Sequence, residues 1–569
     1  MASLTDVKPH KSYAPIGIWI LGIALVQVWL GCAKVGEEQA ERFDDSLARA
    51  SIRLVSHAPQ EQQESSGSSQ SPVQPAVYIE DESDSPSQLN GKIATDINER
   101  VKSSATATVS YLGDWEDPKV VLFATGRQHG YIEPCGCTGL ENAKGGLSRR
   151  HTLMKELEAR GWPLVKVDVG NQVRRFGKQA DIKFQRTVDV LTLMNYDAVC
   201  FGPDDLRLSL NGILQPVSTF EKFVCCNADL LELNKPYRIV EAGGKKIAIT
   251  GLLGLEAKKI VKSGRSEDQV SDTLTLSKIG EALSRTVPEM RAEKPDYMVL
   301  LCHATLKETR KVVELFPHDF DVVVTAGGAG EPTLEPDTVK GSKAQIIQVG
   351  TKGMYVGAVG FFDDKERPVR YGRLTLDKEF DDSNEVMEIF ADYQKILEIQ
   401  GMDGLDVKPQ PHPRGTQFVG HEKCGECHTE AYEVFESSPH FHATESLVKP
   451  PNSRGAIARH FDPECLSCHV TGWNPQDYFP YKTGYLSISE THLHTNGCEN
   501  CHGPGSEHVA IEEGDIDVAD KRRDEVRASM RQTLEQAKNG GCYKCHDIDN
   551  SPEFDFDEYW PKIEHKGVD

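Results

Sequence analysis

Four copies of the pattern Cys-x-x-Cys-His lie in the last third of the chain, and they constrain its structure more than any other feature. The copies occupy residues 424–428, 465–469, 498–502 and 542–546. At the Cys and His frequencies of this chain, one such match is expected by chance about 0.01 times, so four copies indicate a shared chemistry. Two cysteines three positions apart can bond the two vinyl groups of one haem, and the His that follows is then placed beneath the iron.

The pattern therefore predicts four c-type haems, each with one proximal histidine. The attachment residues are Cys424, Cys427, Cys465, Cys468, Cys498, Cys501, Cys542 and Cys545. The proximal iron ligands are His428, His469, His502 and His546. Zinc sites and disulfides are the alternative use of paired cysteines, but zinc spacing does not require a His directly after every second Cys.

Histidines for the opposite face of each iron are plentiful. Thirteen of the 19 His lie at or after His412, and four of these are proximal, which leaves nine. The nine are His412, His421, His440, His442, His460, His492, His494, His508 and His565. For each of them an exposed surface position is the alternative, because histidine is often exposed in folded proteins.

Two segments around the motifs resemble the cytochrome c554 family. Residues 497–508, Gly-Cys-Glu-Asn-Cys-His-Gly-Pro-Gly-Ser-Glu-His, resemble its third haem segment, and residues 438–443, Ser-Pro-His-Phe-His-Ala, resemble the segment after its first haem. The resemblance covers about residues 418–547. It implies a tetrahaem domain of short helices and loops with mostly bis-His irons, a five-coordinate haem being one option. It also implies distal ligands, which are first His440 and His508 and then His460, His442 and His494, without assigning them to particular irons.

The N-terminus has the features of an export signal. Lys8 and Lys11 precede an apolar run over residues 14–31 that ends at Cys32, in a sequence similar to a bacterial lipobox. Lipidation of Cys32 is therefore expected, although Trp29 departs from the usual motif and leaves an uncleaved membrane anchor as the alternative. Both predict a bacterial periplasmic or cell-envelope protein tethered to the membrane, which agrees with the extracytoplasmic attachment of c-type haem.

The rest of the chain divides into regions of different composition. We predict a signal peptide over residues 1–32, a disordered acidic and Ser-rich tether over 33–118, an α/β domain over 119–378, a helix and Pro-rich linker over 379–415, and a tetrahaem domain over 416–569. In the α/β region, short β-rich runs alternate with helical ones, which indicates a two-sheet or doubly wound core. The last region lacks sustained periodicity, so a mainly α and irregular domain organised by haem is expected.

The α/β region also resembles a known family. Its motifs at residues 125–130, 145–149, 167–171, 195–199 and 302–303 resemble, in the same order, those of the calcineurin-like metallophosphoesterases of the 5′-nucleotidase type. The resemblance implies a metallophosphoesterase-like two-sheet α/β fold over about residues 120–362. No counterpart of the nucleotidase C-terminal domain is evident, and the motif-rich region occupies its place.

Most metal-ligand positions of that family carry other residues here. By the resemblance, the ligand positions hold Arg127, Asn171, Pro203 and Asp204, and the last His pair reads Gly-Gly-Ala-Gly over residues 327–330. Only His129 and His303 remain. Because a guanidinium repels metal ions, no dimetal centre is expected, and a metal-dependent phosphohydrolase is disfavoured.

The remaining cysteines have two interpretations. Cys135 and Cys137 follow the first strand beside His129, where nearby cations would lower a thiol pKa, so they are candidate redox thiols; a structural disulfide or capped loop is the alternative. Cys225 and Cys226 lie on a predicted strand over residues 222–227. They are expected to contribute small buried side chains, as are Cys200 and Cys302.

The net charge of the chain argues against one class of function. The chain has 64 Lys and Arg against 87 Asp and Glu, a net charge of −23, which argues against nucleic-acid binding. We predict an electron carrier between a membrane-side donor and a soluble acceptor with a basic docking surface. The alternatives are a haem- or thiol-based oxidoreductase acting on a small nitrogen or sulfur compound, and a divergent 5′-nucleotidase-like hydrolase.

Overall fold

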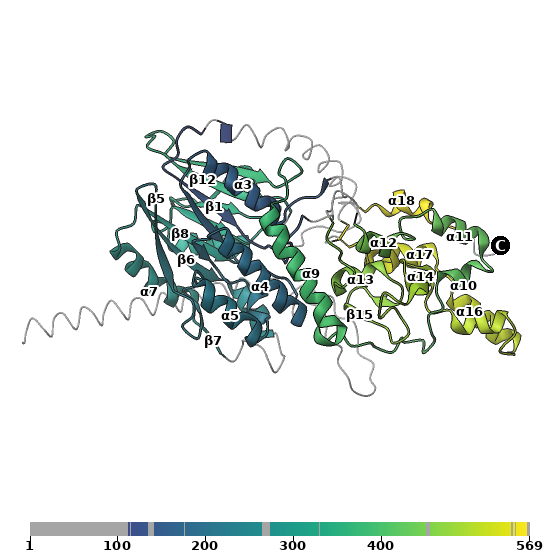
Figure 1. The fold of residues 1–569 in the computed structure, drawn as a ribbon. Helices are drawn as coiled ribbons and strands as arrows, with labels where there is room; N and C mark the ends of the chain where they lie inside the picture. Colours follow the sequence, from purple (N-terminus) through teal and green to yellow (C-terminus); the bar gives the residue numbers. More distant parts are fainter. Residues whose placement is uncertain are drawn as a thin grey trace, which may run out of the picture.

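The computed structural model of the chain describes residues 112–113, 115–134, 142–175, 177–263, 273–328, 330–450, 456–547, 550–551 and 554–565. The predicted signal peptide with Cys32, nearly all of the tether, and both Cys135 and Cys137 lie outside these residues. Figure 1 shows an α/β domain and, beyond helix α9 (Asn384–Gly404), a C-terminal domain of short helices. No helix in the described segments combines the length and the hydropathy of a membrane span.

The first sheet of the α/β domain has five strands in the order β13-β12-β1-β2-β3. They are β1 (Val120–Thr125), β2 (Leu164–Asp168), β3 (Ala198–Val199), β12 (Tyr355–Phe361) and β13 (Val369–Thr375). β1 runs parallel to β2 and antiparallel to β12. All six side chains of β1 are buried, as expected for a central strand that is covered on both faces.

The second sheet has six strands in the order β10-β11-β9-β8-β6-β5. They are β5 (Tyr237–Ala242), β6 (Lys245–Leu253), β8 (Tyr297–His303), β9 (Val322–Thr325), β10 (Asp337–Thr338) and β11 (Gln345–Gln348). Strands β6, β8, β9 and β11 run parallel. The two sheets contact each other at Tyr297 and Phe361, whose ring centroids are 4.0 Å apart. The predicted two-sheet α/β fold is therefore confirmed.

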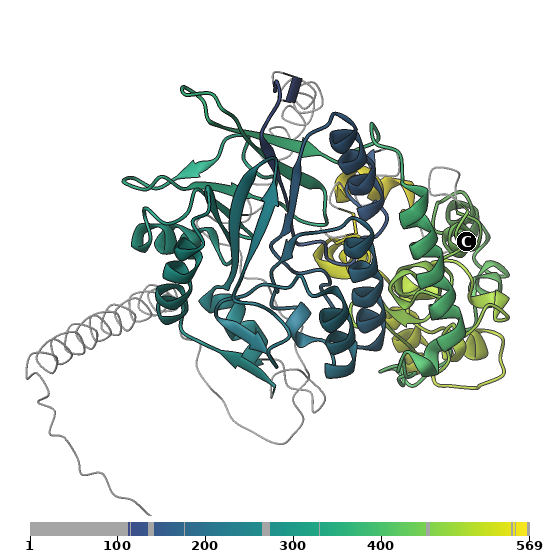
Figure 2. The same ribbon diagram turned by 60° about the vertical axis from the view of Figure 1, so that its left-hand side comes forward.

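Helices cover the outer faces of the sheets, as Figures 1 and 2 show. They are α3 (Leu147–Ala159), α4 (Lys178–Leu193), α5 (Leu210–Phe220), α6 (Leu255–Ser263), α7 (Ile279–Ala292) and α8 (Leu306–Leu315). Most predicted strands form. The strand expected over residues 222–227 is an exception, because this segment makes only isolated bridges at Phe223 and Val224. Cys225 and Cys226 are nevertheless buried, as are Cys200 and Cys302.

The C-terminal domain consists of short elements. They are α10 (His421–Gly425), α11 (Thr429–Glu436), α12 (Ala443–Val448), α13 (Pro463–His469), α14 (Cys498–His502), α15 (Ser506–Glu512), α16 (Asp520–Ser529), α17 (Leu534–Gln536), α18 (Phe556–Tyr559), the hairpin β14 (Trp473–Asn474) and β15 (Phe479–Pro480), and single turns such as η8 (Cys542–Lys544). Its largest apolar cluster contains Phe418, Leu447, Leu466, Val470, Trp473, Tyr485 and Leu493. This cluster is small, so the mainly α and irregular domain buries few of its own apolar side chains.

Ion pairs join the two domains beside helix α13. The Glu464 carboxylate lies 2.6 Å from Lys183 Nζ of α4 and 3.3 Å from Arg175 Nη1. Arg459, just before α13, donates through Nε to Glu133 at 2.8 Å. Burial opposes the ionisation of Glu464, but the charges of Arg175 and Lys183 outweigh it and lower the pKa of this carboxyl to about 2.

A second buried ion pair lies inside the α/β domain. The side chains of Arg150 on α3 and Asp168 at the end of β2 are fully buried, with Nη1 and Oδ2 3.4 Å apart. Asp168 also accepts hydrogen bonds from the Thr125 hydroxyl at 2.6 Å, the Gly170 backbone at 2.8 Å and the Gln172 amide at 2.7 Å. This carboxylate therefore ties the ends of β1 and β2 to the helix above them.

Replacing Arg150 tests this network. We expect Arg150→Met to lower the free energy of unfolding by about 3–5 kcal/mol, because it leaves the Asp168 charge in the core without its cation. Lys155→Met on the same helix is the matched control: its partner Glu385 is half exposed, so the change should stay below about 1 kcal/mol. Denaturant unfolding of the full chain measures both, and equal losses would contradict the assigned role of Arg150.

Glu464 gives a pH-dependent prediction. A carboxyl whose folded pKa is depressed contributes stability above its unfolded pKa of 4.5 and loses it as the pH falls towards 2. The difference in unfolding midpoint between the native chain and Glu464→Gln should therefore be largest above pH 5 and shrink below pH 4.5. Glu398→Gln, which removes a solvent-accessible pair with Lys395, should change little at any pH. A pH-independent effect of Glu464→Gln would exclude the ion pair as its cause.

Candidate functional site

The second and third Cys-x-x-Cys-His motifs lie within α13 and α14, whereas the first and fourth begin in α10 and η8 and continue into the turn that follows each of these helices. In the first and fourth motifs this turn is closed by backbone hydrogen bonds of 3.0 Å, from His428 to Cys424 and from His546 to Cys542. Positions i, i+3 and i+4 of a helical turn share one face. The geometry therefore presents both thiols and the imidazole of a motif to the same side.

Three motif imidazoles are oriented by a hydrogen bond at Nδ1. His469 Nδ1 lies 2.8 Å from the Ala443 carbonyl, His502 Nδ1 lies 2.6 Å from the Met530 carbonyl, and His546 Nδ1 lies 3.0 Å from the Ser551 hydroxyl. A carbonyl can only accept, so Nδ1 carries the proton in the first two. The Nε2 atom is then the one available to a metal, which is the usual arrangement of metal-binding histidines.

Three motif imidazoles also face a second histidine. The ring centroids of His428 and His508 are 6.2 Å apart, those of His440 and His546 are 6.0 Å apart, and those of His502 and His565 are 5.9 Å apart. Two imidazoles that bind one metal from opposite sides have centroids about 6 Å apart, because each ring nitrogen lies about 2 Å from the metal. The spacing of all three pairs fits an iron between the rings.

The other histidines suggested as distal ligands lie elsewhere. His442 is exposed and contacts Glu445 at 3.2 Å, and His494 Nε2 lies 3.0 Å from the Ile488 carbonyl. His460 packs on Phe461, and its buried Nδ1 has no hydrogen-bond partner in the described part of the chain. Of the five suggested distal ligands, the structure thus brings His440 and His508 to motif histidines.

His565 was not among the histidines favoured by the sequence. It lies near the C-terminus, in Lys-Ile-Glu-His-Lys, with no Cys or Gly-Pro context to distinguish it. Only the folded chain shows that it faces His502.

The motifs are grouped in space as two pairs. The Cys424 and Cys498 thiols lie near enough to interact, which raises the pKa of Cys424 and lowers that of Cys498, and the thiols of Cys545 and Cys468 likewise raise the pKa of Cys545 and lower that of Cys468. Burial, with the nearby Cys542 thiol, raises the pKa of Cys501 to about 11. The spatial order is therefore first, third, fourth and second motif.

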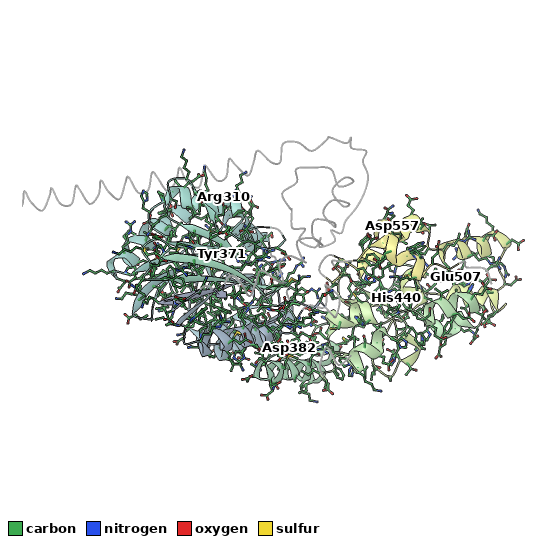
Figure 3. The ribbon with its side chains drawn as sticks, turned by 90° about the horizontal axis from the view of Figure 1, so that it is seen from above. Arg310, Tyr371, Asp382, His440, Glu507 and Asp557 are labelled. Atoms are coloured by element: carbon green, nitrogen blue, oxygen red, sulfur yellow. The ribbon has the colours of Figure 1, made fainter. Side chains whose placement is uncertain are left out.

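This series runs along the C-terminal domain towards the α/β domain. Figure 3 labels His440, which faces the fourth motif, on the side towards the α/β domain, and Glu507, next to His508, further from it. The second motif is nearest the α/β domain, because Glu464 beside it forms the interdomain ion pairs.

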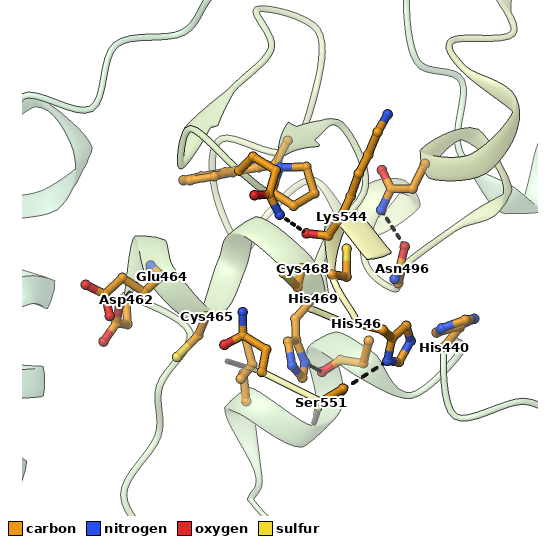
Figure 4. A pocket seen from close by; sticks show the side chains of 18 of the residues that line it. His440, Asp462, Glu464, Cys465, Cys468, His469, Asn496, Lys544, His546 and Ser551 are labelled. Carbon is orange, nitrogen blue, oxygen red and sulfur yellow. Dashed lines mark hydrogen bonds between the residues drawn. The ribbon is translucent and has the colours of Figure 1, made fainter. Parts of the chain in front are cut away.

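A cavity of about 1830 Å³ lies between the two domains (Figure 4). Its wall contains the cysteines and histidines of the second and fourth motifs: Cys465, Cys468, His469, Cys542, Cys545 and His546. The volume exceeds the range of about 300–1,000 Å³ that is usual for small-ligand pockets. Size, paired thiols and oriented imidazoles fit covalently bound haem in this cavity.

The metal-ligand positions of the phosphoesterase resemblance also come together. They lie at the carboxyl ends of the parallel strands, where the loops after β1, β2, β3, β8 and β9 meet. The loops after β1 and β2 are joined by backbone hydrogen bonds from Arg127 to Gly170 and from His129 to Asn171. Arg127, His129 and Asn171 all have positive φ angles, which non-glycine residues rarely adopt.

At these positions the side chains form hydrogen bonds with other groups of the protein. Arg127 Nη1 lies 3.3 Å from the carbonyl oxygens of both Ala326 and Gly328, so its guanidinium spans the place expected for the last His pair. Asn171 donates to Asp204 at 2.9 Å, and His303 Nδ1 lies 2.7 Å from the Val169 carbonyl. Across the described residues, no group of three or more His, Cys, Asp or Glu side chains has the geometry of a metal site.

Comparison with known proteins supports two separate similarities. Residues 423–503 match the family described as cytochrome c554 and c-prime. The chain is 33% identical to cytochrome c-554 of Nitrosomonas europaea over 97 residues, which cover 16% of this chain and 39% of that protein. It is 22% identical to the snake venom 5′-nucleotidase of Crotalus adamanteus over 291 residues, which cover 46% of this chain and 47% of that protein.

Among solved structures, a 5′-nucleotidase precursor from Thermus thermophilus is similar, with 18% identity, a TM-score of 0.42, and coverage of 58% of this chain and 66% of that one. The chain spans less than half the length of the two curated relatives named above. Both resemblances expected from the motifs are confirmed: a segment of cytochrome c554 type follows a calcineurin-like, 5′-nucleotidase-like domain in one chain.

Proposed function

We propose that this protein is an electron carrier with four covalently bound c-type haems. The observation that carries the proposal is the set of three facing imidazole pairs, each containing a histidine of a Cys-x-x-Cys-His motif. The match to the cytochrome c554 family over residues 423–503 supports it. When bound, each c-type haem supplies a one-electron redox couple whose potential the axial ligands and the surrounding charges adjust.

The residues divide this task between attachment and ligation. The two cysteines of each motif would form the thioethers to a haem, and the motif histidine would bind its iron. His508, His440 and His565 would supply a second imidazole to the irons that His428, His546 and His502, respectively, would hold. The Nδ1 hydrogen bonds of His469, His502 and His546 fix the imidazole planes.

We also propose a cellular location and partners for this carrier. The signal-like N-terminus and Cys32 support export and membrane tethering by a lipid or an uncleaved anchor in the bacterial cell envelope. A membrane-side donor and a soluble acceptor would then be the partners. With a net charge of −23, the chain favours a partner with a basic docking surface.

A haem-based oxidoreductase is the second candidate, because the large cavity adjoins two motifs and both domains. A metal-dependent phosphohydrolase is less well supported. Arg127 places a fixed cation among the loops where two metal ions would have to bind, and Asn171 and Asp204 are hydrogen-bonded to each other.

The assignment of His565 can be tested by substitution. We expect His565→Gln to keep the haem content of the native chain but to convert one low-spin haem to a form that binds carbon monoxide. Optical difference spectra and electron paramagnetic resonance measure this change. His492→Gln is the matched control, because His492 is an exposed histidine of the same domain. Identical spectra for His565→Gln and the native chain would reject the assignment.

Phosphatase assays test the α/β domain. With Mn²⁺ or Zn²⁺ added, hydrolysis of a nucleoside 5′-monophosphate by the purified chain should stay at background, because the Arg127 cation and the missing ligands prevent a two-metal site. Asp204→Asn serves as the control for a contaminating enzyme. Metal-dependent hydrolysis that this substitution abolishes would support the hydrolase instead.

A further inference from the structure

Helices α15 and α16 pack together on the side of the C-terminal domain that faces away from the α/β domain (Figure 3). Ion pairs connect the two helices. Arg522 of α16 donates through Nε to Glu507 at 3.1 Å. Arg527 of α16 donates twice to Glu512, from Nε at 2.8 Å and from Nη2 at 2.7 Å. The carboxylates of α15 are therefore tied to arginines of the neighbouring helix.

One of these carboxylates lies beside His508, the histidine that faces the first motif. His508 and Glu512 are four positions apart on α15, so their side chains lie on the same face of the helix. Glu512 Oε1 is 3.9 Å from His508 Nδ1. This nitrogen is buried and has no hydrogen-bond partner in the described part of the chain. A separation of 3.9 Å is too long for a hydrogen bond, so the contact is electrostatic.

The nitrogen beside Glu512 is the one that a metal-binding imidazole leaves free. When a neutral imidazole binds a metal through Nε2, Nδ1 carries the proton. In metal-binding histidines, a carboxylate at this second nitrogen orients the ring and makes it a more basic ligand. Three of the four motif imidazoles are held at Nδ1 by a carbonyl or hydroxyl group, and His428 is the fourth. In the His428–His508 pair, Glu512 is thus placed to orient the second ring.

The Glu512 carboxylate is both fixed and charged. Its hydrogen bonds with Arg527 lower its pKa below the ordinary value, so it is ionised at neutral pH. Arg523 lies further away, with Nη1 3.7 Å from Oε2. Burial lowers the pKa of His508, the Glu512 charge raises it, and Arg527 opposes Glu512 less strongly. The net charge that His508 senses from this ion pair is therefore negative.

The other two facing histidines have different surroundings. Burial, followed by the charges of two nearby histidines, lowers the pKa of His440 to about 4. His565 Nδ1 lies 2.9 Å from the Ile563 carbonyl, which is a neutral acceptor. Among the described residues, no carboxylate forms an ion pair with either ring. Glu512 therefore distinguishes the histidine pair of the first motif from the pairs of the third and fourth.

We propose that Glu512, held by α16, is a positioning residue for His508 and lowers the reduction potential of the haem at the first motif. A negative charge favours oxidised iron, because this carries one more positive charge than reduced iron. The inference rests on the proposed function, because it requires a haem between His428 and His508. A lower potential at this haem favours electron transfer from the first motif to the third, in the direction of the α/β domain.

Spectroelectrochemical titration of the haem-loaded full chain tests the proposal. Glu512→Gln should make one of the four haems about ten-fold easier to reduce, which is a rise of about 59 mV for a one-electron couple. The other three potentials should change much less. Glu507→Gln is the matched control, because it removes an arginine ion pair from the same helix, and in the described residues Glu507 pairs with no histidine. It should leave all four potentials close to those of the native chain.

A further variant identifies the haem and separates the possible failures. His508→Gln should convert the haem of the first motif to a form that binds carbon monoxide, and the potential that rises in Glu512→Gln should belong to this haem. Absence of haem, or an unchanged spectrum of His508→Gln, would overturn the proposed function. Haem-loaded Glu512→Gln with four native potentials, with a rise at another haem, or with the same rise as Glu507→Gln would overturn only the role of Glu512.

Discussion

The C-terminal domain depends on a core that its own side chains do not supply. Its largest apolar cluster has seven buried members, including Leu466, Trp473 and Tyr485, in a region of about 150 residues whose described part contains no helix longer than α16. Four motifs instead present paired thiols and an imidazole, and three further histidines face the imidazoles of the first, third and fourth motifs. Large apolar macrocycles bound at these turns would bury the surfaces that a conventional core buries, so haem attachment and folding would be one process.

Helix α13 couples this core to the α/β domain. It carries the second motif and also Glu464, whose carboxylate is held by two cations of the other domain. An ion pair of this kind is costly to desolvate and contributes orientation more reliably than stability. Its position beside Cys465 therefore fixes where the second motif lies relative to the α/β domain, and the spacing of the groups that line the cavity is determined by both domains.

The sequence predicts the motif residues more directly than the histidines that face them. The Cys-x-x-Cys-His spacing is local, so the sequence alone names the candidate attachment residues, and the Gly-Pro-Gly-Ser-Glu-His context pointed to His508. His565 lies 63 positions after His502, a separation at which spacing carries no information, and only the tertiary fold brings the rings together. In the α/β domain, the central strands β1 and β8 are apolar runs of the kind that indicates a buried strand, whereas the more exposed strand β5 and the partly exposed strand β13 have mixed sequences that give no such signal.

By its resemblance to the phosphoesterases, the α/β domain keeps the loop arrangement of a metal site while several of the ligand positions carry other residues. Loops at the carboxyl ends of parallel strands converge whatever side chains they carry, so this edge remains a place where charges meet. Arg127 is an example. Its guanidinium donates to the carbonyls of Ala326 and Gly328 and so joins two loops that metal ions would bridge in a two-metal site. A fixed cation that the chain itself supplies needs no carboxylate ligands, and at this edge Asn171 donates a hydrogen bond to Asp204. Burial and the charge of Arg127 together hold the pKa of the neighbouring His129 well below its ordinary value, so this edge of the sheet keeps a neutral imidazole beside a fixed guanidinium.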